Sequence, residues 1–146
     1  MSIDTSGKWW IGSEPVDIQG FLKEYSSQGH EVNEFRLARC DCGSEVFYLD
    51  ADDTEGAAKR QCVKCGKEHF ICDSEEYWGE TDPKRCMCVE CGGESVNVGV
   101  GFSLYEDTGD VRWLYVGVRC VTCGILGCFA GWKVAYGPSH HLLDRV

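Results

Sequence analysis

Cysteines at short, repeated spacings constrain the fold of this chain more than any other feature of its sequence. The chain has 146 residues, of which 11 are cysteine, and the dipeptide Cys-Gly occurs at residues 42–43, 65–66, 91–92 and 123–124. Two cysteines two residues apart can point both sulfur atoms at one centre, and a following glycine lets the backbone turn away with a positive φ. The pattern therefore predicts tight cysteine turns that meet in pairs around metal ions.

The cysteine turns occur in the same order twice, which indicates an internal repeat. Each copy places alternating apolar residues on both sides of an acidic turn that contains glycine, at 50–56 in the first copy and 106–109 in the second. Alternation around such a turn is typical of a β-hairpin. The sequence therefore predicts two hairpins, of which the second is the longer, each with cysteine turns at its two ends.

These motifs resemble those of the zinc ribbon superfamily, in which two cysteine turns at the ends of a β-hairpin bind one zinc ion. The resemblance covers residues 40–66 and 88–124, and the two copies look like those of bacterial proteins with two tandem zinc ribbons. It implies two structural Zn(II) ions. The implied ligands are Cys40, Cys42, Cys62 and Cys65 for the first ion and Cys88, Cys91, Cys120 and Cys123 for the second. Because thiolates would fill all four positions, the resemblance implies closed sites with no place for substrate.

The first ligand set departs from the usual pattern. Cys40 and Cys42 are separated by one residue rather than two. Residues i and i+2 of an extended chain point to the same side, so both sulfur atoms can still face one metal ion. His69, four residues after Cys65, could replace one of these cysteines, although a position in the core or at the rim is the simpler interpretation.

The second ligand set has one cysteine too many. Cys86-Met-Cys88 copies the spacing of the first set, whereas Cys88 and Cys91 have the common spacing. The glycine that follows Cys91 favours Cys88 and Cys91 as the ligand pair. Cys86 is then either not a ligand or a substitute for one of them.

Three further points concern the metal and the remaining thiols. Zinc is the preferred metal because it takes four thiolates tetrahedrally without redox chemistry, and iron in a rubredoxin-like site is the competing possibility. Disulfides are disfavoured because the number of cysteines is odd and no secretory signal is visible. Cys72 and Cys128 lie outside both sets. We expect Cys128, in an apolar stretch, to be a small buried thiol, and Cys72 to be unreactive because the carboxylates beside it oppose a thiolate.

Composition divides the chain into three segments. Residues 1–35 contain no cysteine, residues 36–80 carry the first cysteine set, and residues 81–146 carry the second set and a C-terminal tail. In the first segment, apolar residues at helical spacing predict one amphipathic helix, which Ser13 could cap; they are Ile18, Phe21, Leu22 and Tyr25. The expected fold class is therefore small, metal-stabilised and mainly β (α+β), with two tandem zinc-ribbon hairpins and one N-terminal helix.

The charge balance disfavours nucleic acid as a partner. There are 24 acidic and 14 basic residues, which give a formal net charge of −10. Phosphate binding needs clustered Lys and Arg, whereas an acidic surface suits a basic protein partner. The first residues show no basic start followed by an apolar run, and no apolar run is long enough to cross a bilayer. We therefore expect a cytoplasmic protein with no membrane contact.

The sequence favours a non-catalytic role. It contains no recognisable Ser/His/Asp or Cys/His constellation and no glycine-rich phosphate loop of known spacing. The acidic residues at 50–55 lack the spacing of a calcium loop, so we interpret them as a solvated turn. The leading hypothesis is a zinc-binding, acidic protein-protein interaction module. The alternatives are a nucleic-acid-associated zinc ribbon of transcription or translation, and a thiol redox or metal-dependent enzyme.

Overall fold

The computed structural model describes residues 3–134 and 138–146, and it is mainly β with two α-helices. Among these residues, no helix is both long and apolar enough to span a membrane. In chain order the elements are β1 (Ile3–Asp4), β2 (Ile11–Gly12), α1 (Asp17–Tyr25), β3 (Glu34–Leu37), β4 (Phe47–Asp52), β5 (Ala57–Cys62), β6 (Glu68–Phe70), α2 (Ser74–Tyr77), the 3₁₀ helix η1 (Trp78–Glu80), β7 (Lys84–Arg85), β8 (Val96–Leu104), β9 (Val111–Cys120), β10 (Leu126–Lys133) and the 3₁₀ helix η2 (His140–Asp144).

Two antiparallel hairpins form at the positions that the sequence alternation predicts. Strand β4 pairs with β5, and its register ends at Asp52 opposite Ala57, directly beside the acidic turn. Strand β8 pairs with β9 over a longer ladder that runs from Val96 opposite Cys120 to Leu104 opposite Val111. Each hairpin therefore has its turn at one end and its cysteines at the other.

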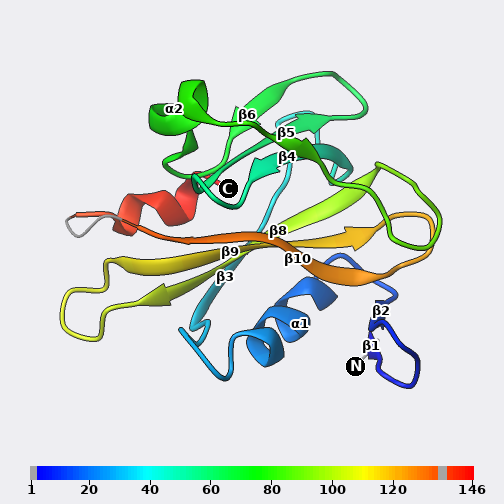
Figure 1. The fold of residues 1–146 in the computed structure, drawn as a ribbon, viewed down its shortest axis with the longest axis horizontal. Helices are drawn as coiled ribbons and strands as arrows, with labels where there is room; N and C mark the ends of the chain where they lie inside the picture. Colours follow the sequence, from blue (N-terminus) through cyan, green and yellow to red (C-terminus); the bar gives the residue numbers. More distant parts are fainter. Residues whose placement is uncertain (1–2, 135–137) are drawn as a thin grey trace.

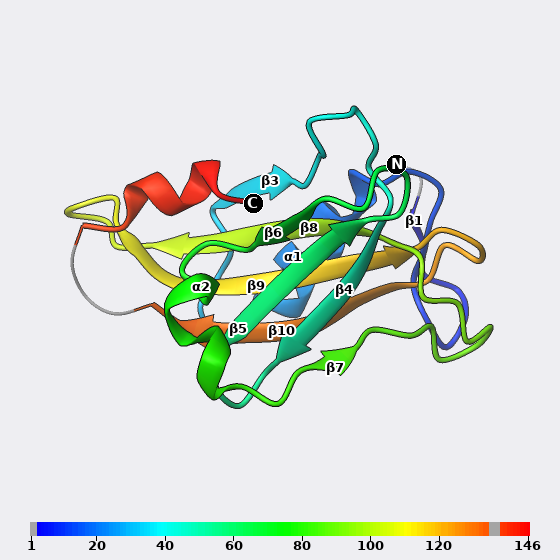
Figure 2. The ribbon, with the colours of Figure 1, turned by 90° about the horizontal axis from the view of Figure 1, so that it is seen from above.

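The two hairpins belong to one strongly bent sheet with the strand order β10-β9-β8-β4-β5-β6. Strands β8 and β4 are joined by a single pair, Phe47 with Val96, because β3 occupies the next part of the same edge of β8. The β4-β5-β6 half therefore turns away and packs over one face of the β8-β9-β10 half, while α1 covers the opposite face (Figure 1, Figure 2).

Apolar residues form a core on each face of the β8-β9-β10 half. The larger core lies between the two halves of the sheet and includes Phe47 from β4 and Val98 from β8, both fully buried. The smaller core lies under α1, where Ile18 and Leu22 are fully buried. Strand β9 contributes aliphatic residues to the first core and aromatic residues to the second; they are Leu114 and Val116 in the first and Trp113 and Tyr115 in the second.

Glycine residues of the sheet allow α1 to approach closely. A Cβ atom at Gly117 would lie 2.6 Å from a methyl group of Ile18 and 3.0 Å from one of Leu22. The helix begins differently from the prediction that Ser13 caps it. Val16 is at the N-cap without a side-chain bond, and the Asp17 carboxylate instead accepts the N–H of Glu14 at 3.0 Å. Asp17 thus fixes the turn that precedes the helix, and the N-cap position itself has no side-chain hydrogen bond.

The last residues of the chain pack against the first hairpin. Leu142, Leu143 and Val146 are buried in the larger core. The backbone N–H of Cys72 donates to the carbonyl of Arg145 at 2.8 Å, and Arg60 Nε of β5 donates to the carbonyl of Val146 at 2.9 Å. This packing was not predicted from the sequence.

Candidate metal centre

Backbone hydrogen bonds give the cysteine turns a common shape. In three turns a glycine N–H donates to the carbonyl of the cysteine four residues earlier, at 2.8 to 2.9 Å; the pairs are Gly66 with Cys62, Gly92 with Cys88 and Gly124 with Cys120. In the shorter turn, Gly43 donates to Cys40, three residues earlier, at 2.8 Å. All four glycines have a positive φ, between 71° and 93°, which a residue with a side chain adopts at a cost. The missing residue thus tightens the first turn without changing its role.

The turns bring the eight predicted sulfur atoms into two groups of four. In the first group, Cys40 Sγ lies 3.5 Å from Cys65 Sγ and Cys42 Sγ lies 3.6 Å from Cys62 Sγ. In the second group, Cys88 Sγ is 3.2 Å from Cys123 Sγ, and Cys91 Sγ is 3.6 Å from Cys120 Sγ.

Both groups are positioned to hold a metal ion. Within each group the sulfur atoms all lie within 4.8 Å of one another. Four thiolates at 2.3 Å from a tetrahedral ion would be about 3.8 Å apart, so each group is close to the size that one ion requires. Every ligand position of such an ion would be taken by a sulfur atom of the chain.

Backbone N–H groups stabilise the thiolate form of one cysteine in each group. The N–H of Cys65 points to Cys62 Sγ at 3.4 Å and lowers the pKa of Cys62 to about 6. Burial raises the pKa of Cys88, but the N–H groups of Cys91 and Glu90 outweigh this effect, and the pKa falls to about 7. Hydrogen bonds from N–H to sulfur favour the charged form, which is the form that binds metals.

An ion pair joins the two turns of the first group. Lys67, which follows Cys65-Gly66, pairs with Asp41, the residue between Cys40 and Cys42. The hydrogen bond and charge of Lys67 lower the pKa of Asp41. Both side chains are exposed, so we assign this pair a small part in holding the turns together.

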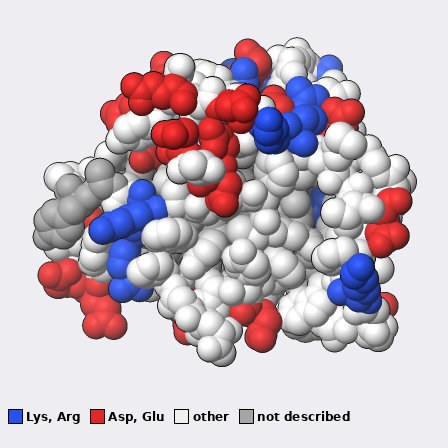
Figure 3. Space-filling model, in the orientation of Figure 1, with Lys and Arg blue, Asp and Glu red and all other residues white. Residues whose placement is uncertain are grey.

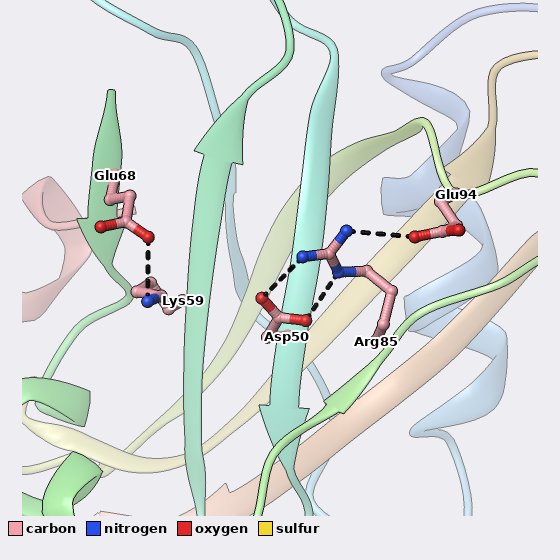
Figure 4. Close-up of polar contacts among 5 residues, drawn as sticks. All are labelled: Asp50, Lys59, Glu68, Arg85 and Glu94. Atoms are coloured by element: carbon pink, nitrogen blue, oxygen red, sulfur yellow. Dashed lines mark hydrogen bonds and ion pairs between the residues drawn. The ribbon is translucent and has the colours of Figure 1, made fainter. Parts of the chain in front are cut away.

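Arg85 ties the start of the second group to the first hairpin. Its guanidinium bonds both carboxylate oxygens of Asp50 on β4, at 2.7 and 3.3 Å, and Glu94 beyond the Cys91 turn, at 3.1 Å (Figure 4). The N–H of the next residue, Cys86, donates to the carbonyl of Leu49 at 2.8 Å. The segment that leads to Cys88 is therefore fixed to β4. Figure 4 also shows the pair of Lys59 and Glu68, at 2.9 Å, which links β5 to β6.

The N-terminal segment holds the last turn of the second group. Gly12 N–H donates to the carbonyl of Gly124 at 2.8 Å, and Arg119 Nε donates to the carbonyl of Gly12 at 2.6 Å. The N–H of Leu126 donates to the carbonyl of Trp10 at 2.8 Å. No sequence motif predicts these contacts, because they join groups that are far apart in the chain, and most of these groups belong to the backbone.

The remaining cysteines and His69 lie outside both groups. Cys86 is buried in the larger core, and burial raises its pKa to about 11. His69 Nε2 lies 3.0 Å from the carbonyl of Arg145 instead of near a sulfur atom. Within residues 3–134 and 138–146, no other set of His, Cys, Asp and Glu side chains comes together as a possible metal site.

Cys72 and Cys128, the other two thiols outside both groups, have raised pKa values. The Cys72 thiol donates to the carbonyl of Leu142 at 3.5 Å, and burial raises its pKa strongly. Burial also raises the pKa of Cys128 to about 12, with a further contribution from the charge of Asp53. A reactive thiol needs a lowered pKa and access to solvent, and neither group has a lowered pKa.

Comparisons with known proteins identify no relative of this chain. The chain was compared with protein-family models, with curated proteins and with solved structures, and none of them matches. The geometry of the two groups of four cysteines is therefore the main guide to the chemistry of this protein.

Proposed function

We propose that each group of four cysteines binds one Zn(II) ion, and that each hairpin with its two cysteine turns is a zinc-ribbon unit. The support is the approach of four sulfur atoms to within 4.8 Å in both groups. Four thiolates suit zinc and also iron, and zinc is preferred because it forms such closed structural sites without redox chemistry. The ion supplies a cross-link between the two turns of a hairpin.

In this proposal the metal sites are structural and the protein is not an enzyme. Four cysteines fill the coordination shell of each ion, which leaves no position for a substrate. Cys72, which is buried, and Cys128, which is partly buried, both have raised pKa values, which supports an unreactive role for them. We expect the protein to act in the cytoplasm, where a reducing medium keeps thiols available to zinc.

We propose further that the protein binds a basic protein partner through an acidic face. This face consists of exposed carboxylates of the β4-β5 turn and of the segment from α2 to β7, and they gather over α2 and the β4-β5 hairpin in Figure 3. Its residues are Asp53, Glu55, Glu75, Glu76, Glu80 and Asp82. Among the described residues, Glu55, Glu75, Glu76 and Glu80 form no ion pair, so their charges are free to meet those of a partner.

A hollow within the acidic face is the observation that carries this proposal. It has a volume of about 520 Å³, and its walls include Asp53, Glu55, Glu80 and Asp82 together with one cation, Lys84, which pairs with Asp82 at 3.3 Å. The carboxylates outnumber this lysine, so the hollow has a net negative charge. The carboxylate of Asp52 fixes its shape, because it accepts the N–H groups of Glu55 at 3.1 Å and of Asp82 at 2.9 Å. A Lys or Arg side chain of a partner would find several carboxylates there at once, which favours specific and fast association.

Several of the basic residues that nucleic acid would need are already paired. Lys67 is paired with Asp41, Arg36 with Glu34, Lys84 with Asp82, and Arg85 with Asp50; the bonding distances other than that of Lys67 lie between 2.7 and 3.3 Å. Contact with phosphate would have to compete with these carboxylates. A nucleic-acid-associated ribbon therefore stays the less favoured alternative.

Native mass spectrometry tests the metal part of the proposal. We expect two zinc ions per chain after purification under reducing conditions. Iron in their place would contradict the choice of metal, and well-ordered protein without metal would contradict the structural role.

Affinity capture followed by binding measurements tests the partner. A purified partner should bind several-fold more weakly to Glu55→Gln/Glu80→Gln than to the parent protein, and its affinity should fall with salt. Glu106→Gln, in the β8-β9 turn, is the matched control and should bind like the parent. Equal binding by both variants, or retardation of nucleic acid by the protein that weakens steeply with salt, would speak for another function.

A further inference from the structure

An apolar pocket opens beside the second cysteine group. It has a volume of about 400 Å³ and lies between the N-terminal segment, α1 and β10. Aromatic side chains dominate its walls: Trp9, Trp10, Phe21, Tyr25 and Phe129. A volume of this size is within the range of binding sites, roughly 300 to 1,000 Å³, and aromatic residues are enriched where proteins meet partners.

Several apolar residues at the rim of this pocket are exposed to solvent. Tyr25 is 56% exposed, Met87 56% and Val89 69%. Tyr25 stacks on Phe21 with ring centroids 5.9 Å apart, so its ring is held in place although it faces solvent. Apolar side chains that are ordered and exposed together mark an interaction surface better than scattered ones do.

The apolar pocket adjoins the acidic hollow at one shared wall residue. Phe129 of β10 is a wall of both cavities. Asp53, in the wall of the acidic hollow, is fixed because its Oδ1 accepts the N–H of Gly131 at 2.9 Å, two residues after Phe129. In Figure 3 the acidic side chains border a broad uncharged region over β10 and α1. Carboxylates thus adjoin one end of an aromatic pocket.

At the far rim of the pocket the chain places a cation of its own, so a partner's Lys or Arg is expected at the end that adjoins the acidic hollow. Trp9 donates its indole N–H to Glu90 Oε1 at 2.9 Å. Lys8 Nζ lies 5.1 Å from the centroid of the same indole ring, so a cation already rests on an aromatic surface here. Lys8 is the one charged residue among the described residues of the pocket wall, and it forms no ion pair with a described carboxylate.

We propose that the pocket anchors a cationic, amphipathic segment of the protein partner, whose apolar side chains enter the pocket while a neighbouring Lys or Arg enters the acidic hollow. This inference rests on the proposed function and adds the site and the chemistry of the bound segment. The charge of the adjoining hollow decides for a cationic segment and against an anionic one, because carboxylates repel a like charge at the shared wall.

Defined peptides test this site. The probe is a capped peptide of about 14 residues with Leu and Lys at helical spacing; the comparisons are a Leu/Glu peptide of the same pattern and a peptide with Ala in place of Leu. We expect the Leu/Lys peptide to bind and to change the fluorescence of the protein, since Trp9 and Trp10 line the pocket. The other two peptides should bind at least about tenfold more weakly.

Two pairs of variants locate the bound peptide. Tyr25→Ala should weaken binding of the Leu/Lys peptide about tenfold, whereas Val16→Ala, which removes a 48% exposed residue outside the pocket, should not. Asp53→Asn keeps the oxygen that accepts the Gly131 N–H but loses the charge, and it should weaken binding about threefold. Its control, Asp107→Asn in the β8-β9 turn, should bind like the parent protein. Zinc content and circular dichroism of each variant verify that it is folded.

Three results would overturn the inference: no binding of the Leu/Lys peptide, equal binding of the Leu/Glu peptide, or equal effects of Tyr25→Ala and Val16→Ala. If the purified partner still depends on Glu55 and Glu80 in that case, the proposed function stands and only the pocket loses its role. If the partner ignores the acidic face as well, the proposed function fails with it.

Discussion

At the scale of the residue, the cysteine turns show which positions tolerate change. Each sulfur atom of a group lies within 4.8 Å of the other three, so removing one leaves only three ligands. Cys128 is a useful contrast, because its thiol donates to the carbonyl of Ala130 at 3.4 Å and takes no part in either group.

We predict that Cys65→Ser and Cys123→Ser each lower the zinc content from two ions to one per chain. The hydroxyl of Ser is a much poorer zinc ligand than a thiolate. Cys128→Ser should keep both ions, whatever its effect on stability. Native mass spectrometry checks all three variants, and an unchanged metal count in Cys65→Ser would remove Cys65 from the ligand set.

Gly124 lies where a side chain would be both strained and too close to the N-terminal segment. Gly124 has a φ of +79°, and a Cβ atom there would lie 2.7 Å from the carbonyl oxygen of Gly12. Gly124→Ala should therefore lower the free energy of unfolding by about 2 to 4 kcal/mol, the sum of backbone strain and a clash with a hydrogen-bonded segment.

Gly43→Ala is the matched control for the strain alone. Gly43 has a φ of +93° but no atom within 4 Å of the Cβ position, so we expect a loss of about 1 to 2 kcal/mol. Urea denaturation in zinc-containing buffer measures both changes. Equal losses of free energy in the two variants would show that the segment around Gly12 moves away from the new methyl group at no cost.

At the scale of the element, the docking of α1 depends on the absence of side chains beneath it. Ile18 and Leu22 are fully buried against the sheet, and they contact the positions where Gly117 and Gly101 have no Cβ atom. The helix has nine residues, too few to be stable alone in water, so this contact is what keeps it folded.

We predict that Gly117→Ala lowers the free energy of unfolding by about 1 to 3 kcal/mol, because the new methyl group would lie 2.6 Å from Ile18. Gly79→Ala, where nothing lies within 4 Å of the Cβ position and φ is not positive, should change it by less than about 0.5 kcal/mol. Chemical denaturation compares the two, and a neutral Gly117→Ala would mean that α1 can shift at no cost.

The parts of the fold that the sequence predicts are those that depend on local patterns. The two hairpins and the helix were predictable because alternation, turn residues and helical spacing are local patterns, and the mainly β class follows from them. The prediction that Ser13 caps the helix was wrong: serine is a frequent cap, but here Val16 is at the N-cap and no side chain bonds there. The glycines under α1 carried no sequence signal, since their role depends on a helix some 80 to 100 residues away in the chain.

The candidate site follows the same rule. The spacing predicts Cys88 and Cys91 as a pair, and the structure groups these two cysteines, and not Cys86, with Cys120 and Cys123. Their role as metal ligands stays a prediction. The contacts that support the second group were not predictable, because Gly12 and Asp50 are remote in sequence. Gly12 reaches the group through backbone hydrogen bonds, and Asp50 through its ion pair with Arg85. The identity of the metal stays a prediction.

At the scale of the whole molecule, the two cysteine groups are linked by a shared core. Phe47 lies beside the first group in β4, Val96 lies beside the second in β8, and these two residues pair directly. Both are buried in the larger core. We therefore expect a change in one cysteine group to reach the other through these packed side chains.

We predict that removing the metal with a strong chelator lowers stability by several kcal/mol and that both hairpins loosen together. Structural zinc contributes on the order of 10 kcal/mol of apparent binding energy to small domains. Circular dichroism and amide hydrogen exchange, with and without chelator and at constant reducing potential, check this. Independent loosening of one hairpin would show that the shared core does not couple the groups, and unchanged exchange would contradict a structural metal.

The return of residues 138–146 to the first hairpin bears on how the protein is made. A ribosome that has released the chain only up to Cys123 has supplied all eight thiols, yet Leu142, Leu143 and Val146 have still to enter the core beside β5. The first hairpin therefore cannot complete its side of the core until residues 138–146 have also left the ribosome.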